Sequence, residues 1–328
     1  MVLNGHDAGA VAQAARALAD GRLVALPTET VYGLGARADD EAAVARIFAA
    51  KGRPSDHPLI VHVADRDGAR AFTPRWTPLA DRLTAAFWPG PLTVIVERRP
   101  GIATAAAAGQ DSVGLRCPAH PVAHALLREV ATLGVAGVAA PSANLFGRVS
   151  PTTAAHVAAE FGDDLLVLDG GPCVVGIEST IVDCRGSRPV LLRPGQLSRP
   201  QIEAAAGQAL AAPDEAAPRV SGSLVSHYAP RATLRLMDAG MLKAAMQVLG
   251  TDVPGVAVYS LSLAPDPVRR LGLRWRRMPA RADQAAQELF SVLRDFDAEG
   301  VRLIWVEEPP CTPEWEGVRD RLHRAAAP

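Results

Sequence analysis

Residues 26–63 read LPTETVYGLGARADDEAAVARIFAAKGRPSDHPLIVHV and combine a strand end, a Thr/Glu/Gly loop, a helix, a basic loop and a second strand. The apolar run 23–26 predicts a buried strand. Pro27 has no N–H to donate to a sheet, so we expect the chain to leave the sheet there. The hydroxyl and carboxylate groups of 28–30 then follow the C-terminal end of a strand, where open α/β sheets bind ligands. The stretch therefore predicts a binding loop beside a sheet.

Two further features of this stretch each have a structural and a functional interpretation. Gly33 and Gly35 permit a positive φ or a close approach of the backbone to a bound group. Apolar residues recur at helical spacing over 40–50, which predicts a helix. Lys51 and Arg53 follow its end, where a cation stabilises the helix dipole by roughly 0.3–1 kcal/mol. Because glycine and proline restrict the loop around these cations, binding of an anion is the alternative interpretation.

The composition is that of a folded protein with an ample core, and its charge is nearly balanced. Of 328 residues, 48% are hydrophobic and 21% are charged, and the formal net charge is -1. This length favours two domains, and the balance argues against a protein that binds nucleic acid mainly through charge. The cysteines predict neither a zinc site nor a disulfide framework, because no C-x-x-C pair occurs. With no leader sequence and no long apolar run, we expect a cytosolic protein without membrane association.

Two α/β domains joined by a linker are expected. Residues 1–204 predict a domain with a twisted, mixed sheet, because strands outnumber helices in its second half. Residues 205–232 lose periodicity and are at first rich in Ala, Pro, Asp and Glu, which predicts a linker. Within it, 221–230 read SGSLVSHYAP, and a pure spacer would not need the His-Tyr pair. Residues 233–328 alternate strands and helices, which predicts a small doubly wound, Rossmann-like domain that lacks a G-x-G-x-x-G fingerprint.

Cations and hydroxyl groups gather at the predicted strand ends and loops of the first domain. These residues are Lys51, Arg53, Arg116 and Arg193 with Thr30, Ser112, Ser142, Ser150, Ser179 and Thr180. Arginine matches carboxylate and phosphate groups in bidentate fashion, so the set suits a triphosphate, a carboxylate or both. No Ser/His/Asp spacing or cysteine nucleophile stands out. We therefore expect a site for anionic small molecules that acts by positioning and charge neutralisation.

Six motifs, in this order along the chain, resemble those of the YrdC-type threonylcarbamoyl-AMP synthases. They are Pro27-Thr-Glu-Thr-Val-Tyr-Gly-Leu-Gly, Lys51-Gly-Arg-Pro, Pro58-Leu-Ile-Val-His-Val, Ala140-Pro-Ser-Ala-Asn, Glu178-Ser-Thr-Ile-Val-Asp and Arg193-Pro-Gly. The segment Ser226-His-Tyr-Ala-Pro and the trailing α/β domain resemble the longer, two-domain form. The resemblance implies a YrdC-like fold and a nucleotidyltransferase that converts L-threonine, bicarbonate and ATP to L-threonylcarbamoyl-AMP and pyrophosphate. The product would feed N6-threonylcarbamoyladenosine formation on tRNA.

The resemblance also implies a role for individual residues. L-Threonine would be held by Thr30, His62, Arg116, the backbone of Ala140, Ser179 and Thr180. The ATP side would be lined by Lys51, Arg53, His57, Ser112, Ser142, Asn144, Ser150 and Arg193. Lys51 and Arg53 would lie nearest the phosphates as the catalytic cations, and Tyr228 would close over the nucleotide from the linker. His57 departs from the family pattern, which commonly has Asn after the acidic residue.

The same resemblance sets expectations for cofactors and partners. Mg²⁺ would enter with ATP, with no residue assigned as a metal ligand and no organic cofactor. The product would pass to the downstream tRNA threonylcarbamoyl transferase machinery, and direct stable tRNA binding is not expected.

Two alternatives remain open at the level of sequence. A basic concave surface made by Lys51, Arg53, Arg116 and Arg193 could belong to a non-catalytic module that binds RNA, such as tRNA. The near-neutral charge and the 5% of aromatic residues count against it. A carbamoyl-transfer role in metallocentre assembly is the second alternative, since YrdC-like modules occur in such proteins, and the absence of zinc-finger cysteines argues against it.

Overall fold

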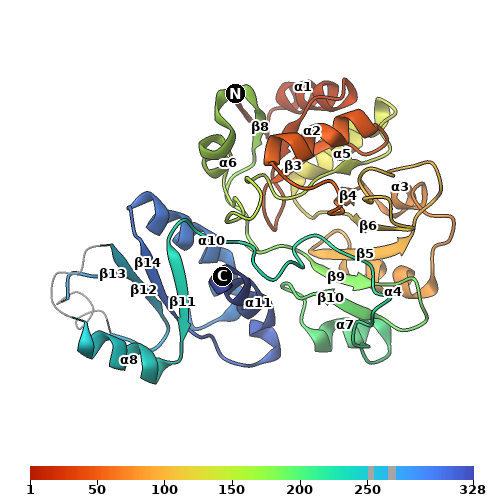
Figure 1. Cartoon of the computed structure of the whole chain (residues 1–328). Helices are drawn as coiled ribbons and strands as arrows, with labels where there is room; N and C mark the ends of the chain where they lie inside the picture. The colour runs from red at the N-terminus through yellow and green to blue at the C-terminus, as the bar shows by residue number, and fades with distance from the viewer. Residues whose placement is uncertain (250–254, 265–270) are drawn as a thin grey trace. The chain divides into compact units, whose positions relative to one another are not determined.

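The computed structural model describes residues 1–249, 255–264 and 271–328, which form two compact units (Figure 1). The N-terminal unit comprises 1–146 and 150–223, and the C-terminal unit comprises 147–149 and 224–328. The predicted linker 205–232 is thereby divided, because 205–223 belong to the first unit and 224–232 to the second.

The N-terminal unit is built on a ten-stranded sheet with the order β1-β8-β2-β3-β7-β4-β6-β5-β9-β10. The strands are β1 Val2–Asn4, β2 Val24–Leu26, β3 Gly33–Arg37, β4 Ile60–His62, β5 Leu92–Glu97, β6 Ser112–Arg116, β7 Val138–Ala139, β8 Leu166–Asp169, β9 Thr180–Asp183 and β10 Val190–Arg193. The sheet contains both parallel pairs, such as β4 with β6, and antiparallel pairs, such as β5 with β6. The expected mixed sheet is confirmed.

Seven α-helices accompany this sheet. They are α1 Ala8–Ala19, α2 Glu41–Lys51, α3 Arg66–Arg70, α4 Pro78–Phe87, α5 Pro121–Thr132, α6 Ala154–Phe161 and α7 Arg199–Ala206, with a 3₁₀ turn η1 at Gly162–Asp164. Side-chain caps fix where several begin: Asp40 accepts the first free amides of α2, and Thr77 accepts one of α4. The sequence pattern did not indicate β1, β3, α3 and α7, because each is short or, in β3, contains two glycines.

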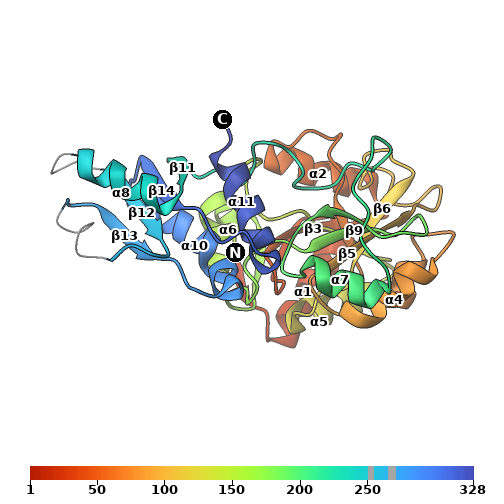
Figure 2. The ribbon, with the colours of Figure 1, turned by 90° about the horizontal axis from the view of Figure 1, so that it is seen from below.

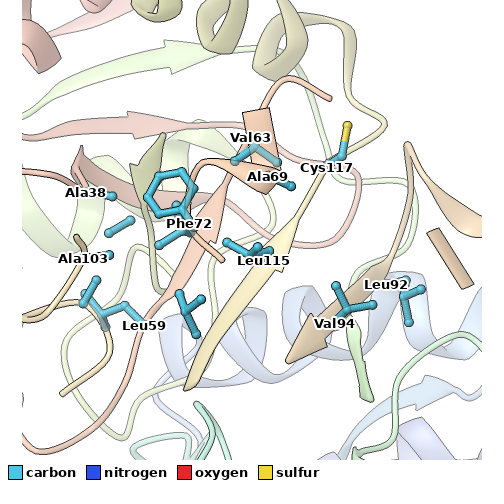
Figure 3. Packing of buried hydrophobic residues seen from close by; sticks show 14 of the residues in the cluster. Ala38, Leu59, Val63, Ala69, Phe72, Leu92, Val94, Ala103, Leu115 and Cys117 are labelled. Atoms are coloured by element: carbon cyan, nitrogen blue, oxygen red, sulfur yellow. The ribbon is translucent and has the colours of Figure 1, made fainter. Parts of the chain in front are cut away.

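Helices pack on both faces of the sheet. On one face, α1 and α5 lie side by side (Figure 2) and bury Leu18 and Leu126 against Val24 and Leu168. The opposite face carries a larger core to which α2 and α4 contribute. Phe72 lies in that core among Val63, Leu115 and Ala38 (Figure 3).

Side chains alternate between the two faces along each strand. As a result, polar groups lie on the same face of the sheet as α1 and α5, in a part that these helices do not cover. In β4, β5 and β6 every second residue enters the larger core, as Val61, Val94 and Leu115 do. The residues between them point to the other side. We call this surface the site face; its members are Ile60, His62, Thr93, Ile95, Ser112, Gly114, Arg116 and Ile181. It lies over β4, β6, β5 and β9, whereas α1 and α5 cover β2, β7 and β8.

The C-terminal unit contains a four-stranded parallel sheet in the order β11-β14-β12-β13. Its elements are β11 Thr233–Met237, α8 Ala239–Val248, β12 Val256–Ser260, β13 Arg274–Arg277, α10 Ala282–Ala298, β14 Leu303–Glu307, η2 Pro313–Trp315 and α11 Glu316–Ala326. Leu242 of α8 packs with Val258 on one face, and Tyr259 on the other face bonds to Glu288 of α10. Helices therefore flank both faces, and the expected doubly wound arrangement is confirmed.

No helix within the described residues combines the length and the apolar character needed to cross a membrane.

Candidate active site

Arg116 is the best anchored side chain of the site face. It ends β6 and is 4% exposed. Its Nη1 donates to Thr30 Oγ1 at 2.8 Å, and its Nε donates to the carbonyl of Gly90 at 3.3 Å. Its Nη2 lies 2.7 Å from Glu29 Oε1 in an ion pair. The loop 28–30 predicted from the sequence is thus held against the end of β6.

His62 lies beside Arg116, because the two residues are partners in the register of β4 and β6. Burial, reinforced by the charge of Arg116, lowers the pKa of His62 to about 3. The imidazole is therefore neutral at physiological pH. Its Nδ1 makes no hydrogen bond with the described part of the chain. A neutral ring with a free nitrogen next to an arginine suits the binding of an amino acid.

The start of β9 and the end of β10 form the next part of the site. Arg193 donates through Nη2 to the Ser179 carbonyl at 2.9 Å and to Ser179 Oγ at 3.1 Å. Thr93 and Ser179 share a hydrogen bond between hydroxyls at 2.7 Å. The Thr180 hydroxyl instead bonds to the backbone of Leu197. Ser179 is thus oriented within the site, whereas Thr180 fastens the loop that follows β10.

Gly195 explains the third position of the Arg-Pro-Gly motif. A Cβ there would lie 2.5 Å from the Thr180 nitrogen and 2.7 Å from the Glu178 carbonyl. Only glycine permits this approach, which brings the segment after Arg193 against the start of β9.

Lys51 is buried at the end of α2 and is hydrogen-bonded to the neighbouring loop. Its Nζ donates to the carbonyl of Ser142 at 2.6 Å and also to that of Asn144. Burial, and secondarily the charge of Arg53, lowers the pKa of Lys51 well below its ordinary value. Lys51 therefore ties the Ala-Pro-Ser-Ala-Asn loop to the helix, in addition to any role toward phosphate.

Arg53 and His57 share Phe146 as an aromatic neighbour. The Arg53 guanidinium lies 5.5 Å from the centre of the Phe146 ring and donates to the Pro58 carbonyl at 3.2 Å. The His57 ring centre is also 5.5 Å from that of Phe146. Partial burial and the charge of Arg53 lower the pKa of His57. His57, which departs from the family pattern, thus packs on the Phe146 ring that Arg53 also contacts.

Residues 219–221 connect the two arginines expected near phosphate. Arg193 Nη1 donates to the Ser221 carbonyl at 2.7 Å, and Arg53 Nη2 donates to Ser221 Oγ at 3.5 Å. Val220 is 5% exposed and packs with Ile95 and Ile181 on the site face. Residues 219–221 of the predicted linker therefore occupy the surface between Arg53 and Arg193.

Three further predicted residues of the N-terminal unit are buried or hydrogen-bonded within it. Ser112 is buried at the start of β6. Ser150 donates its hydroxyl to the buried carboxylate of Glu178. The amide of Ala140 is engaged, because it donates to the Ile60 carbonyl at 2.9 Å. If this backbone holds a ligand, it does so through the carbonyl.

Tyr228 belongs to the C-terminal unit and is 1% exposed. Its ring stacks on Phe290 with 5.6 Å between centres, and the Arg321 guanidinium lies 5.2 Å from its centre. In the described structure it is a core residue of that unit. Its predicted closure over the nucleotide stays a prediction.

One expectation about the opening stretch needs correction. Gly33 and Gly35 lie in β3 and not in a loop. A Cβ on Gly35 would lie 2.9 Å from side-chain atoms of Leu26 and Val138. The close approach that the glycine permits is to the protein's own core.

Several residues of the site were not assigned from the sequence. They are Glu29, Thr93, Phe146, Glu178 and Ser221. Glu29 and Glu178 stand inside quoted motifs, where an acidic residue beside predicted ligand-binding hydroxyls is a usable signal. The other three carry no comparable signal, because their neighbours come from distant parts of the chain.

Comparisons with known proteins agree over nearly the whole chain. A family model of the Sua5, YciO and YrdC proteins, described as telomere recombination, matches residues 16–195. A second, described as the C-terminal domain of threonylcarbamoyl-AMP synthase, matches residues 197–327. The chain is 38% identical to a threonylcarbamoyl-AMP synthase of Bacillus subtilis, covering 96% of this chain and 92% of that protein. It is 33% identical to the one of Schizosaccharomyces pombe, covering 93% and 85%.

A solved structure is similar over the same extent. The crystal structure of Sua5 from P. abyssi, in complex with L-threonine, matches with a TM-score of 0.87 and 32% identity. The match covers 99% of this chain and 97% of that one. The chain therefore belongs to the threonylcarbamoyl-AMP synthase family, in the form that carries the additional C-terminal domain.

Proposed function

We propose that the protein is an L-threonylcarbamoyladenylate synthase that uses L-threonine, bicarbonate and ATP and releases pyrophosphate. The observation that carries the proposal is the distribution of cations over one face of one sheet. Arg116 lies at the end of β6, and Ser112 lies at its start. At about 3.3 Å per residue these two are about 13 Å apart. Arg53 and Arg193 meet at Ser221, which lines a recess together with Ser112.

This spacing suits an amino acid at one end and a nucleotide at the other. Arg116 would bind the threonine carboxylate, with His62, Thr30 and Ser179 beside it. Arg53 and Arg193 would neutralise the phosphates, which is how a site without a nucleophile accelerates phosphoryl chemistry. The amino-acid side takes support from the threonine complex of the P. abyssi relative.

The reaction balances with these groups alone. The threonine amine forms a C–N bond to the bicarbonate carbon, and water leaves to give the carbamate. A carbamate oxygen then bonds to the α-phosphorus of ATP while the bond between the α-phosphorus and the bridging oxygen breaks. Pyrophosphate departs with the electron pair. The protein contributes proximity and charge neutralisation, since each step joins anions that repel one another.

Mg²⁺ is proposed to enter on the triphosphate. Among residues 1–249, 255–264 and 271–328 there is no group of three or more His, Cys, Asp or Glu side chains that could hold a metal. The two site carboxylates, Glu29 and Glu178, are engaged by Arg116 and Ser150. Mg²⁺ binds readily through phosphates, waters and few protein groups, so this donor set fits an ion carried by ATP. When bound, the ion neutralises phosphate charge.

The burial of the cations disfavours the RNA-binding alternative. Lys51, Arg116 and Arg193 are 3%, 4% and 2% exposed. A polynucleotide backbone binds cations on an accessible surface, and these side chains are too enclosed to follow it. We therefore propose that the product is passed to a tRNA threonylcarbamoyl transferase system without stable tRNA binding by this chain.

The direct test is synthesis by the purified protein. With L-threonine, labelled bicarbonate and Mg-ATP we expect pyrophosphate and an acid-labile labelled adenylate in equal amounts. Reactions without threonine, and reactions with L-valine in its place, are the controls. Absence of threonine-dependent pyrophosphate release would refute the proposed function.

A further inference from the structure

We propose that Glu29 is a positioning residue that orients Arg116 for the α-carboxylate of the amino-acid substrate. The inference rests on the proposed function, because it assumes that Arg116 meets that carboxylate. It adds a residue that the motif comparison did not assign to either substrate.

The Glu29 carboxylate is held from two sides in a buried place. The residue is 5% exposed. Its Oε1 lies 2.7 Å from Arg116 Nη2, and its Oε2 accepts the amide of Ala119 at 3.1 Å. Both partners lie on the segment that leaves β6. The carboxylate therefore fixes the side chain and the following turn relative to each other.

The backbone around Glu29 is fixed as well. Its carbonyl accepts the amide of Val175 at 2.7 Å, and the carbonyl of Thr30 accepts that of Gly176 at 3.1 Å. With its backbone tethered, its side chain buried and its Oε2 bonded to the Ala119 amide, the carboxylate has little freedom to move with its partner. Glu29 is thus a fixed support against which the guanidinium rests, and pre-organisation of this kind reduces the entropic cost of binding.

The donors that remain on Arg116 define what it can bind. A guanidinium has five N–H groups in one plane. Gly90 accepts the one on Nε, and Thr30 accepts one on Nη1. Nη2 lies 2.7 Å from Glu29 Oε1 in an ion pair that lacks hydrogen-bond geometry, so at least one N–H remains on each Nη. Two parallel donors of this kind match the two oxygens of a carboxylate. Glu29 and Thr30 together select which edge of Arg116 faces the ligand.

Removal of the Glu29 charge has two opposing consequences. It leaves Arg116 less neutralised, which would by itself strengthen attraction for any anion. It also frees Arg116 Nη2 and the turn at Ala119, so the two terminal guanidinium nitrogens lose their alignment with the ligand carboxylate. We expect orientation to outweigh net charge, because a bidentate contact depends steeply on geometry, whereas the added charge attracts every anion alike.

The test compares the affinities of two ligands that differ only in the group that Arg116 is proposed to bind. L-Threoninol carries a CH₂OH group in place of the carboxylate of L-threonine. Calorimetric titration without ATP compares the chain with its Glu29→Gln variant. We expect L-threonine to bind about 10- to 100-fold more weakly to the variant, as for loss of one hydrogen bond to a charged group. L-Threoninol should bind with unchanged affinity, so the preference for the carboxylate falls by the same factor.

Asp183→Asn is the matched control. Asp183 is a buried carboxylate of the same sheet that pairs with Arg185 at 2.9 Å. Its replacement removes an equivalent ion pair without touching Arg116, and threonine affinity should not change. Glu29→Asp keeps the charge but shortens the reach by one methylene, and we expect a smaller loss of the same selectivity. It also serves as the test variant if Glu29→Gln does not fold by near-UV circular dichroism.

Three results would overturn the proposal. Tighter threonine binding by Glu29→Gln would mean that charge neutralisation dominates. Equal weakening of both ligands would reduce Glu29 to a structural role. Unchanged binding would remove it from the site. Because binding is measured without synthesis, a protein that binds threonine selectively but releases no pyrophosphate would refute the proposed reaction and leave this inference standing.

Discussion

Replacement of Val220 by alanine is expected to strengthen ATP binding. Val220 is 5% exposed and packs with Ile95 and Ile181, and its neighbour Ser221 accepts hydrogen bonds from Arg53 and Arg193. If these two arginines bind the phosphates of ATP, residues 219–221 must release them first. The contacts of Val220 then oppose nucleotide binding.

The magnitude follows from the buried surface. Val220→Ala removes two methyl groups, each worth about 0.8 kcal/mol when buried, or about 1.6 kcal/mol together. If this energy is lost only when the segment leaves the site, ATP affinity rises by up to about 15-fold. Val174→Ala makes the same chemical change at a residue that is 66% exposed, and should leave affinity unaltered.

The assay is calorimetric titration with a non-hydrolysable ATP analogue in the absence of threonine. Thermal unfolding without ligand is the check on the fold: the midpoint of Val220→Ala should fall by a few degrees, because the same buried contact is lost from the folded state, whereas that of Val174→Ala should not change. Unchanged or weaker ATP binding by Val220→Ala would refute the reasoning, because it would mean that 219–221 remain in place over the bound nucleotide.

Three further substitutions test separate parts of the molecule. Arg53→Ala should lower pyrophosphate release on the order of 10- to 100-fold with the fold retained; unchanged steady-state kinetics would return Arg53 to the role of a cation at a helix end. Tyr228→Ala should destabilise the C-terminal unit by about 3–5 kcal/mol, as for other large core aromatics, whereas a loss of activity without a change in denaturant unfolding would favour its predicted closure over ATP. The pKa of His62 is depressed in the folded state to about 3, so the unfolded chain binds the extra proton below about pH 6.5 and stability falls with pH from there. Between pH 6.5 and 5 the loss should approach about 2 kcal/mol in urea titrations and shrink in His62→Gln; equal pH dependence in both proteins would contradict it.

The main elements of both units could be predicted because their signals are local. The helix that ends at Lys51 has an N-cap, apolar spacing and a C-terminal glycine within one stretch. The alternation of strands and helices after 233 has the same local character. β3 was missed because its glycines weaken the strand pattern, although Gly35 is required by the close approach of Leu26 and Val138, which are contributed by other strands.

The candidate site also combines features that are local in sequence with features that are not. Arg116, Arg193 and Ser179 could be named from motif and residue type. Their arrangement could not, because β6, β9 and β10 meet only through a mixed strand order. The Thr180 hydroxyl was assigned to threonine, yet in the structure it bonds to Leu197. Which hydroxyl faces the ligand depends on the loop packed behind it.

The sequence by itself determined the local elements, the chemical character of the site and the order of its motifs, since these follow from neighbouring residues. Only the tertiary structure decided that the loop 28–30 meets the end of β6, that Glu29 pairs with Arg116, and that 219–221 lie between Arg53 and Arg193. These contacts join residues far apart in the chain. They form because strand order and the alternation of side chains leave part of one sheet face uncovered by α1 and α5, and loops from distant parts of the chain pack there.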